Sequence, residues 1–353
     1  MKLLECMSQP DNNKLVTIIV SPRERFNISA RSLDSIYEHT EAAFDLVYID
    51  GGSPRYVRDY LAKAASERGF KLIRSETYLS PNQARNLGLR HVRTRYVVFV
   101  ENDVVVSPGW LTALVDCAEE TGAAVVGPLI CEGSTPHTIV HFAGGVCGLR
   151  EIESHGKHER HVFDRIFSQG QPVATLAPTL RRQPTQLAEF HCILVRLALL
   201  RETGPLDERI FSTRDHIDFC LVVADSGGTI YFEPASVVTF MNTGRMRLSD
   251  LHYYMLRWSD GWERASLLRL AEKWNLSTDG ALGSRLKNVG WRRRNRLIRP
   301  LVRSLGLGPQ TIASKIAIRT LVILDRGLNA VIGVRHRRFD RTERRLRSGA
   351  GKG

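Results

Sequence analysis

The sequence predicts an α/β protein with a mostly parallel sheet, followed by a basic helical extension. Short β-branched and aromatic runs alternate with segments of helical periodicity over the first 110 residues. The runs are apolar throughout, as in strands that are buried on both faces. Basic charge is concentrated in residues 281–353, where 19 Lys and Arg accompany only 3 Asp and Glu.

The alternation is regular enough to place each element. Strands are expected at residues 14–20, 44–49, 70–74 and 96–100, with helices at 56–68 and 82–91 between them. Apolar residues at helical spacing predict a further helix between the first two strands. Connections of this length are typical of right-handed crossovers between parallel strands. The second strand ends in Asp50 and a Gly-Gly turn, and the second helix ends at Gly69.

Three polar residues, Glu101, Asn102 and Asp103, follow the fourth strand. They lie past the carboxyl end of a parallel strand, where open α/β sheets bind ligands. In extended backbone Glu101 and Asp103 would point the same way, so the two carboxylates need a positive partner. A hard divalent cation that carries a diphosphate is one such partner. A bare triplet of this kind is more often a solvated turn, so the neighbouring motifs decide. Ser107 and Pro108 are expected to open the next helix.

Several functional classes are excluded. The chain has no GxGxxG after its first strand and no GxxxxGK[ST] motif, so neither a dinucleotide fold nor a P-loop is expected. Its apolar runs stay below the roughly 18 residues that span a bilayer. The six cysteines are scattered and no secretory segment is recognisable, which indicates free thiols in a reducing, cytoplasmic compartment.

Four motifs follow one another in the first 111 residues. They are the turn 50–53 (DGGS), the segment 84–88 (ARNLG), the triplet 101–103 and the segment 107–111 (SPGWL). Together with the strand VTIIV they resemble glycosyltransferase family 2, whose members are inverting nucleotide-sugar enzymes with a GT-A fold. The resemblance covers roughly residues 14–240.

The resemblance implies roles for particular residues. Asp50 has the position of the acid that contacts the base or ribose, and Asp103 that of the metal and diphosphate ligand. The family usually has Asp where Glu101 stands. The cofactor implied is a divalent metal, Mn²⁺ or Mg²⁺. The nucleotide-sugar site implied comprises Asp50, Arg85, Asn86, Glu101, Asn102, Glu189 and His191.

The second half of the resemblance concerns the acceptor. Glu189 and His191 alternate with Phe190, so both are expected on the same side of a strand. Farther on, the family has an acid-acid-x-Asp motif that supplies the general base. Asp215 and His216 stand at its first two positions, and a carboxylate or an imidazole is chemically workable there. We prefer Asp215 slightly and keep both residues, although a capping Asp is also ordinary at a helix start.

Two features concern possible metal-ligating histidines. Thr239 stands where a metal-ligating His often follows the last strand. Five histidines, His137, His141, His155, His158 and His161, have neither HExxH spacing nor a Cys partner. We therefore expect hydrogen-bonding or solvated histidines there rather than a metal site.

The chain is expected to comprise a catalytic domain (1–245), a helical segment near the active site (246–280) and a basic tail (281–353). Outside that tail, 31 basic and 34 acidic residues nearly balance. Residues 311–334 have apolar positions at helical spacing among Lys and Arg. This pattern predicts an amphipathic helix, which either binds the anionic inner face of the cell membrane or docks on the domain.

These observations indicate a metal-dependent, hexosyltransferase-like enzyme of polysaccharide or glycolipid synthesis. The donor would be a UDP-, GDP- or dTDP-linked sugar, and the acceptor a glycan or a lipid-linked molecule. The alternative is a catalytically weak or inactive nucleotide-sugar-binding module, since a fold alone does not imply activity. A nucleic-acid partner is not expected, because the basic tail carries no recognised motif for one.

Overall fold

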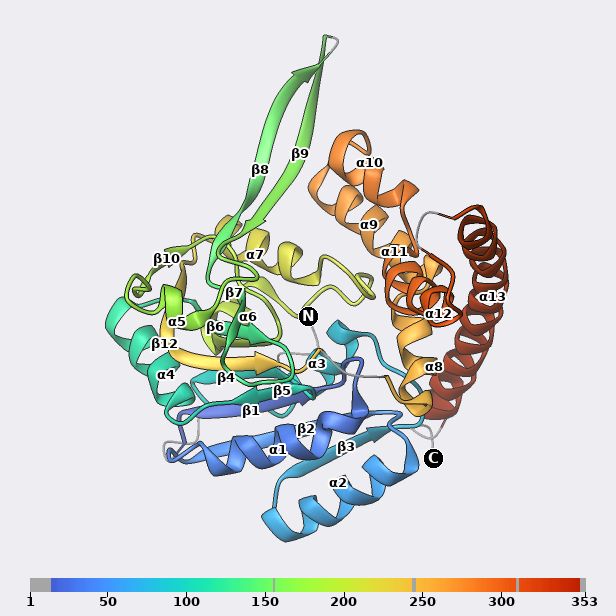
Figure 1. Cartoon of the computed structure of the whole chain (residues 1–353). Helices are drawn as coiled ribbons and strands as arrows, with labels where there is room; N and C mark the ends of the chain where they lie inside the picture. Colours follow the sequence, from blue (N-terminus) through green and yellow to red (C-terminus); the bar gives the residue numbers. More distant parts are fainter. Residues whose placement is uncertain (1–13, 155, 243–245, 309–310, 350–353) are drawn as a thin grey trace. The chain divides into compact units, whose positions relative to one another are not determined.

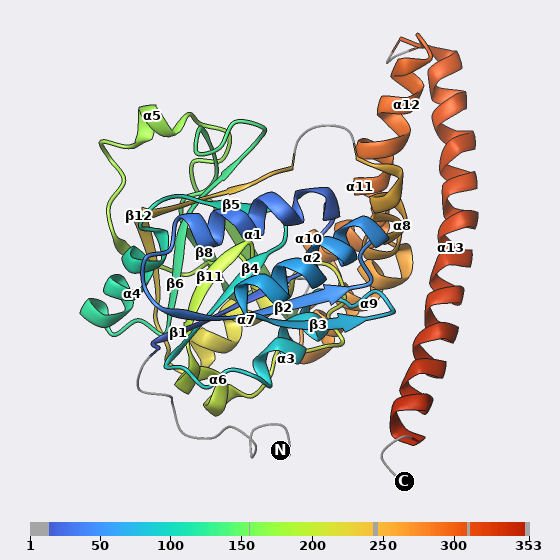
Figure 2. The same cartoon turned by 90° about the horizontal axis from the view of Figure 1, so that it is seen from below.

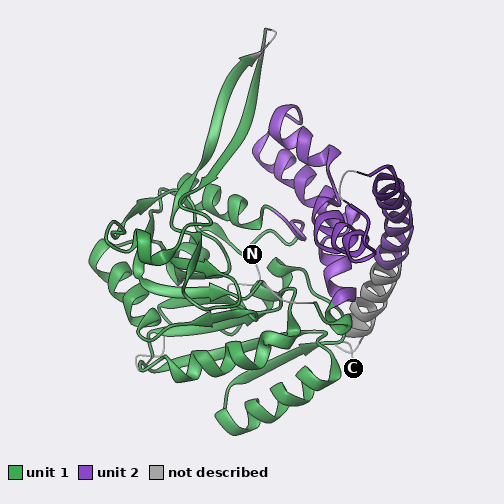
Figure 3. Cartoon of the chain, in the orientation of Figure 1, with its two compact units in different colours: residues 1–208, 214–250 green, residues 209–213, 251–353 purple. Residues whose placement is uncertain are grey.

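The computed structural model describes residues 14–154, 156–242, 246–308 and 311–349. Contacts divide the chain into two compact units, shown in Figure 3. Unit 1 comprises residues 1–208 and 214–250, and unit 2 comprises residues 209–213 and 251–353.

Unit 1 is built on a ten-stranded sheet with the order β10-β12-β6-β11-β4-β1-β2-β3, while β5 pairs with β12 and β7 with β6. The four strands β4, β1, β2 and β3 are parallel neighbours, as are β6 and β12. β11 runs antiparallel between β4 and β6. The predicted α/β fold is therefore confirmed, but the sheet is mixed: β10, β11, β5 and β7 pair antiparallel with their neighbours. The strands are β1 (Val16–Ser21), β2 (Phe44–Gly51), β3 (Lys71–Ser75), β4 (Tyr96–Glu101), β5 (Val104–Val106), β6 (Val125–Glu132), β7 (Ile139–Phe142), β10 (Gln183–Thr185), β11 (Cys192–Arg196) and β12 (Ile230–Phe240).

Helices cover both faces of this sheet. Figure 2 shows α1 and α2 on one side of β1, β2 and β3, and α3 and α6 on the other. α3 begins with a capping box between Ser80 and Gln83, and α2 ends at Gly69 in the left-handed region. The helices of this unit are α1 (Ser29–Glu38), α2 (Arg55–Arg68), α3 (Pro81–Leu89), α4 (Trp110–Thr121), α5 (Val173–Leu176), α6 (Leu197–Thr203) and α7 (Asp215–Asp225), with the 3₁₀ helix η1 (Phe26–Ile28) before α1.

The start of α4 differs from the prediction. The helix begins at Trp110, and its N-cap is Gly109 with φ 73°, so Ser107 and Pro108 are not its first residues. Instead, Trp110 N donates to Ser107 O across 3.3 Å and closes a turn. This turn buries the Trp110 indole completely, and its Nε1 donates to Thr40 Oγ1 at 3.0 Å. A glycine takes the positive φ at little cost, and the burial of a large ring stabilises the later start.

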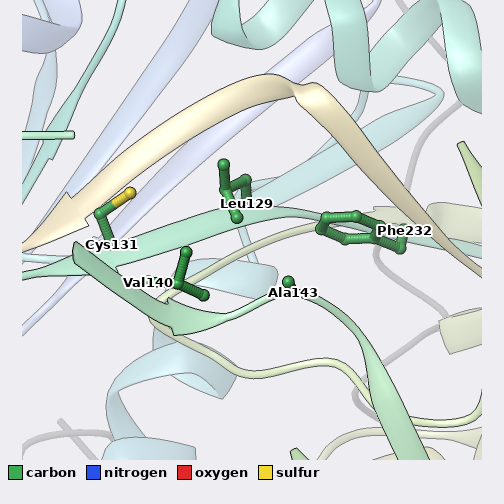
Figure 4. Close-up of a cluster of buried hydrophobic side chains, with 5 residues drawn as sticks. All are labelled: Leu129, Cys131, Val140, Ala143 and Phe232. Atoms are coloured by element: carbon green, nitrogen blue, oxygen red, sulfur yellow. The ribbon is translucent and has the colours of Figure 1, made fainter. Parts of the chain in front are cut away.

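A small apolar cluster seats β7 against the sheet. Leu129, Cys131, Val140, Ala143 and Phe232 pack together between β6, β7 and β12 (Figure 4). Because side chains alternate along a strand, the burial of Val140 in this cluster directs His141, the next residue of β7, to the opposite face of the strand. The chain then forms a long antiparallel hairpin, β8 (Gly145–Ser154) and β9 (Lys157–Ile166), which projects from unit 1 in Figure 1.

Unit 2 is helical and is held together by buried polar contacts. Arg293, whose side chain is 1% exposed, donates to Asp260 at 2.6 Å and to Asp325 at 2.9 Å. Asn329 donates to Met255 O and accepts from Asp260 N. Residues from both sides of position 281 therefore share one packed interior. The helices are α8 (Leu248–Arg257), α9 (Asp260–Trp274), α10 (Gly280–Lys287), α11 (Trp291–Arg293), the π-helix η2 (Arg294–Ile298), α12 (Arg299–Ser304) and α13 (Ile312–Gly349).

Two further expectations concern the whole chain. In the part that the structure describes, no helix is both long and apolar enough to cross a bilayer. The cysteines at 117, 131, 147, 192 and 220 are buried free thiols, and Cys6 lies outside the described residues.

Candidate functional site

Polar side chains gather where β1, β2 and β4 end together. Ser21 of β1 is in register with Glu101 of β4, and Asp50 lies next to the end of β2. Parallel neighbours present their carboxyl ends at one edge, so the loops after these strands meet there. This edge of unit 1 holds the predicted acidic triplet.

Glu101 is the centre of a buried ion network. Its carboxylate pairs with Arg23, which follows β1, and lies 3.3 Å from Arg85 of α3. His191 Nδ1 lies 2.8 Å from the carboxylate oxygen that meets Arg23, and the Glu101 side chain is only 1% exposed. The acidic triplet was expected to need a positive partner. At Glu101 that partner is the pair of guanidinium groups of Arg23 and Arg85.

Arg85 joins this network to the start of α7. Its Nη1 donates to Asp215 Oδ2 at 2.6 Å and to Asn82 Oδ1 at 3.0 Å. The guanidinium lies over the Phe190 ring, 3.8 Å from its centroid, and is completely buried. A buried arginine with two carboxylate partners and an aromatic face is held in one orientation. Arg85 therefore fixes Glu101 and Asp215 relative to each other.

Asp103 is completely buried, and its charge acts on Arg23. Burial lowers the pKa of Arg23, but the charges of Glu101, Glu24 and Asp103 outweigh it, and the net pKa lies above its ordinary value. The backbone oxygen of Asp103 accepts from Met241 N at 2.9 Å, which ties the triplet to the end of β12. Its carboxylate is a set of hard oxygen donors, the kind that Mg²⁺ and Mn²⁺ take.

Asp50 and Asn102 are fixed by neighbouring loops. Asp50 accepts from Ser53 N at 2.9 Å and pairs with Arg74 of β3. Asn102 accepts from Arg23 N at 2.6 Å, and its amide nitrogen donates to Ser29 Oγ at 2.8 Å. Both side chains therefore lie at the strand ends in defined orientations.

Asn86 is engaged elsewhere. Its amide donates to Leu206 O and Glu208 and accepts from Leu206 N, at 2.8 to 3.1 Å. These bonds use both donors and one acceptor position of the side chain. In this structure Asn86 supports the loop before residue 209, and it does not face Glu101 as Arg85 does.

Glu189 and His191 lie on the same side, and His141 of β7 joins them. Glu189 Oε2 is 3.0 Å from His141 Nε2 and 3.8 Å from His191 Nε2. Within the described residues these three side chains form a group that could hold a metal. Local spacing could not reveal it, because His141 and Glu189 are 48 positions apart. The available signal was the alternation of Glu189 and His191.

Neighbouring charges set the protonation of this group. Burial lowers the pKa of His141, but Glu189 and Glu132 raise it to about 9. Burial and the charge of Arg23 lower the pKa of His191 to about 4, against the opposing charge of Glu101. The Glu189 carboxyl has a pKa below its ordinary value, since His141 and His191 outweigh the effect of burial.

The candidate bases occupy the first turn of α7. The preceding residue, Arg214, is the N-cap with φ 68° and donates to Asp164 at 2.8 Å. Asp215 Oδ1 lies 3.6 Å from His216 Nδ1, and the side chains are 9% and 23% exposed. Thr239 stands where the resemblance implies a metal-ligating His. Its Oγ1 accepts from the backbone N of His137 at 2.7 Å and lies 2.8 Å from His137 Nδ1.

A comparison with models of protein families finds a match, which lies in the first half of the chain. The model of the family described as "Glycosyl transferase family 2" matches residues 17–165. An uncharacterized protein of Sinorhizobium fredii, y4gI, is 24% identical over 222 residues, which are 62% of this chain and 23% of that protein. The pre-mycofactocin glycosyltransferase of Mycobacterium tuberculosis is 25% identical over 170 residues, 47% of this chain and 31% of that protein. The chain thus spans less than a third of either relative.

Two further similarities are consistent with this match. The chondroitin synthase of Escherichia coli is 24% identical over 140 residues, 39% of this chain and 20% of that protein. A crystal structure of GalNAc-T7 with UDP, GalNAc and Mn²⁺ superposes with a TM-score of 0.50 at 14% identity, over 81% of this chain and 58% of that one. This superposition confirms the predicted GT-A fold.

Proposed function

Because the chain belongs to glycosyltransferase family 2 by its residues 17–165, we propose that it transfers a sugar with inversion from a nucleoside diphosphate to an acceptor hydroxyl. The observation that supports this best is the position of Arg85. It joins Glu101, in the strand-end triplet, to Asp215, in the candidate base motif. Donor and acceptor groups must be held in one geometry for an in-line displacement, and this bridge provides such a link.

On the donor side, Asp103 would hold Mg²⁺ or Mn²⁺ through its carboxylate. A divalent ion there would neutralise the diphosphate leaving group. Arg23 lies beside the same edge and adds positive charge. Asp50, held by Arg74 and the Ser53 amide, would accept from the base or ribose of a UDP-, GDP- or dTDP-linked sugar.

On the acceptor side, the general base would come from the first turn of α7. The 2.6 Å contact with Arg85 holds Oδ2 of Asp215 in an ion pair. His216 has no such contact with Arg85 and is the more exposed of the two side chains. We therefore propose His216 as the base and Asp215 as the group that positions it, which reverses the slight preference drawn from the motif.

The exposed face of α13 supports a membrane-bound acceptor. Ile312, Ile316 and Ile323 are 77%, 59% and 70% exposed, and at 100° per residue they share one side of the helix. Exposed basic residues line one edge of that side, namely Lys315, Arg319 and Arg326. An apolar strip edged with cations fits an anionic lipid surface. We propose that unit 2 binds such a surface and that the acceptor is a lipid-linked or nascent glycan.

Donor hydrolysis by the full chain is the direct test. The purified protein would be offered a panel of UDP-, GDP- and dTDP-sugars with and without Mn²⁺, and release of the nucleoside diphosphate would be measured. We expect one donor to be hydrolysed slowly without an acceptor, in a metal-dependent way. The His216→Ala variant is the matched control for contaminating hydrolases. Binding of a donor with no turnover under any condition would contradict the enzymatic proposal.

A further inference from the structure

We propose that His141, Glu189 and His191 form a transition-metal site, of the type that takes Zn²⁺, separate from the carboxylate of Asp103. Three ligand atoms from two parts of the chain converge in this group. Two ligand atoms bound to a tetrahedral Zn²⁺ at about 2.0–2.1 Å lie about 3.3 Å apart. The distances from Glu189 Oε2 to the two Nε2 atoms, 3.0 and 3.8 Å, lie on either side of that value.

The missing hydrogen bond at Glu189 Oε2 favours a shared centre over a simple ion pair. Its Oε2 is buried and accepts no hydrogen bond from the described residues, although His141 Nε2 is 3.0 Å away. A donor and an acceptor at that distance normally align along the N–H bond. Ligand atoms that surround a metal ion all point at the ion, so they lie close together without forming hydrogen bonds to one another. A cation placed between them satisfies all three.

The His141 imidazole is hydrogen bonded to a carboxylate at its outer nitrogen, and a second carboxylate lies near the outer nitrogen of His191. His141 Nδ1 is hydrogen bonded to Glu132 Oε2 at 3.2 Å, and His191 Nδ1 lies 2.8 Å from Glu101 Oε2. At His141 the hydrogen-bonded carboxylate places the proton on Nδ1 and turns the Nε2 lone pair inward, as in most histidine metal sites. Glu132 is in turn held by Asn242 Nδ2 at 2.6 Å. Such support is found around ligands that must keep one orientation.

The donor set identifies the class of ion. Two imidazoles and one carboxylate are borderline ligands that suit Zn²⁺ and neighbouring first-row ions, whereas Mg²⁺ and Ca²⁺ prefer oxygen alone. Three protein ligands leave a coordination position for water or a substrate oxygen. The Phe240 ring lies 4.1 Å from the His191 ring centroid and covers one side of the group. The site therefore differs in chemistry from the proposed donor metal at Asp103.

The experiment measures the metal itself. The full chain would be stripped with a chelator and titrated with Zn²⁺ against a chromogenic competitor, and Co²⁺ would report nitrogen ligation by its visible absorption. We expect one tight equivalent in the wild type and its loss in Glu189→Gln, which keeps the size of the side chain. Glu132→Gln should weaken binding about 10- to 100-fold by releasing His141. His161→Ala, on β9 and outside the group, is the matched control and should bind as the wild type does.

Each outcome is decisive. Equal Zn²⁺ affinity in the wild type and Glu189→Gln, or no tight equivalent at all, overturns the metal site. Thermal unfolding of each apo variant would be compared with apo wild type, and a misfolded Glu189→Gln would be replaced by His141→Gln. Donor hydrolysis is followed separately. Hydrolysis without the Zn²⁺ equivalent sinks this inference alone, and tight Zn²⁺ without hydrolysis sinks the proposed activity alone.

Discussion

Arg85 Nη1 donates to Asp215 Oδ2 across 2.6 Å, between residues 130 positions apart in the chain. Arg85 is completely buried and the Asp215 side chain is 9% exposed, so water contributes little to either charge. The same guanidinium is 3.3 Å from Glu101. Removal of the Arg85 side chain would take away the guanidinium group that Glu101 and Asp215 share.

We expect Arg85→Ala to destabilise the protein by about 3–5 kcal/mol, the usual cost of removing one partner of a buried ion pair. Arg85→Lys should recover only part of that, because an ammonium cannot reproduce the planar fork. Urea unfolding followed by circular dichroism measures both. Arg90→Ala, at the exposed end of α3, is the control and should change stability by less than about 0.5 kcal/mol. A similar loss in the two alanine variants would show that the bridge does not stabilise the fold.

Replacement of His216 should distinguish the two candidate bases. If His216 takes the acceptor proton, His216→Ala loses roughly 10²–10⁴-fold in turnover while donor affinity is nearly kept. Asp215→Asn should then cost less, because it removes a positioning group. Steady-state transfer kinetics measure the turnover of each variant, and calorimetry with the nucleotide measures its donor affinity. Wild-type turnover in both variants would show that the first turn of α7 is not the catalytic element.

The local sequence pattern was sufficient to predict the first strands of the sheet. It could not predict features that depend on contacts between residues far apart in the sequence. The apolar run that starts at Tyr96 forms a buried strand, because all its side chains suit a strand that is covered on both faces of the sheet. Ser107 was a reasonable N-cap, but burial of Trp110 moved the start of α4. His141 meets Glu189 only because β7 is seated on β6, which no spacing rule reveals. Arg23, which pairs with Glu101, lies outside the four motifs of the sequence, so no local pattern indicates its role.

Asp103→Asn should remove the metal dependence of donor binding. The amide keeps the volume of this completely buried side chain but loses the charge that a divalent ion needs. Calorimetry with UDP, with and without Mn²⁺, should show at least a roughly tenfold loss of affinity only in the presence of the ion. Asp116→Asn, on the exposed face of α4, is the matched control. Unchanged Mn²⁺-dependent affinity would exclude Asp103 as the ligand.

The metal-free protein should lose stability as the pH rises. The pKa of His141 is raised on folding from 6.5 to about 9 by Glu189 and Glu132, against burial, and His191 beside it is neutral. A raised pKa stabilises the fold fully below 6.5, and that contribution is lost as the pH passes 9. We therefore expect the free energy of unfolding to fall between pH 6.5 and 9 in a chelating buffer. His141→Gln should flatten this fall, whereas His161→Gln should keep it. A wild-type slope in the His141 variant would assign the fall to other groups.

The basic helix α13 should attach the protein to anionic vesicles. Deletion from residue 281 is a poor test, because Arg293 and Asn329 both bond to Asp260 inside unit 2. Exposed positions on α13 can be changed without touching that interior. Each cation near an anionic surface contributes about 1 kcal/mol, so neutralising three should weaken partitioning by about 100-fold.

Co-sedimentation of the full chain with phosphatidylserine-containing vesicles measures this attachment. The basic variant replaces Lys315, Arg319 and Arg326 by Gln, and the apolar variant replaces Ile316 and Ile323 by Ser. Leu268→Ser, exposed on α9, is the control for a lost apolar side chain. Binding of the wild type should fall with added salt, since charges at a surface are screened within about 10 Å at 0.1 M. If the wild type ignores anionic vesicles at low salt, or both α13 variants bind as it does, α13 is not a membrane-binding surface.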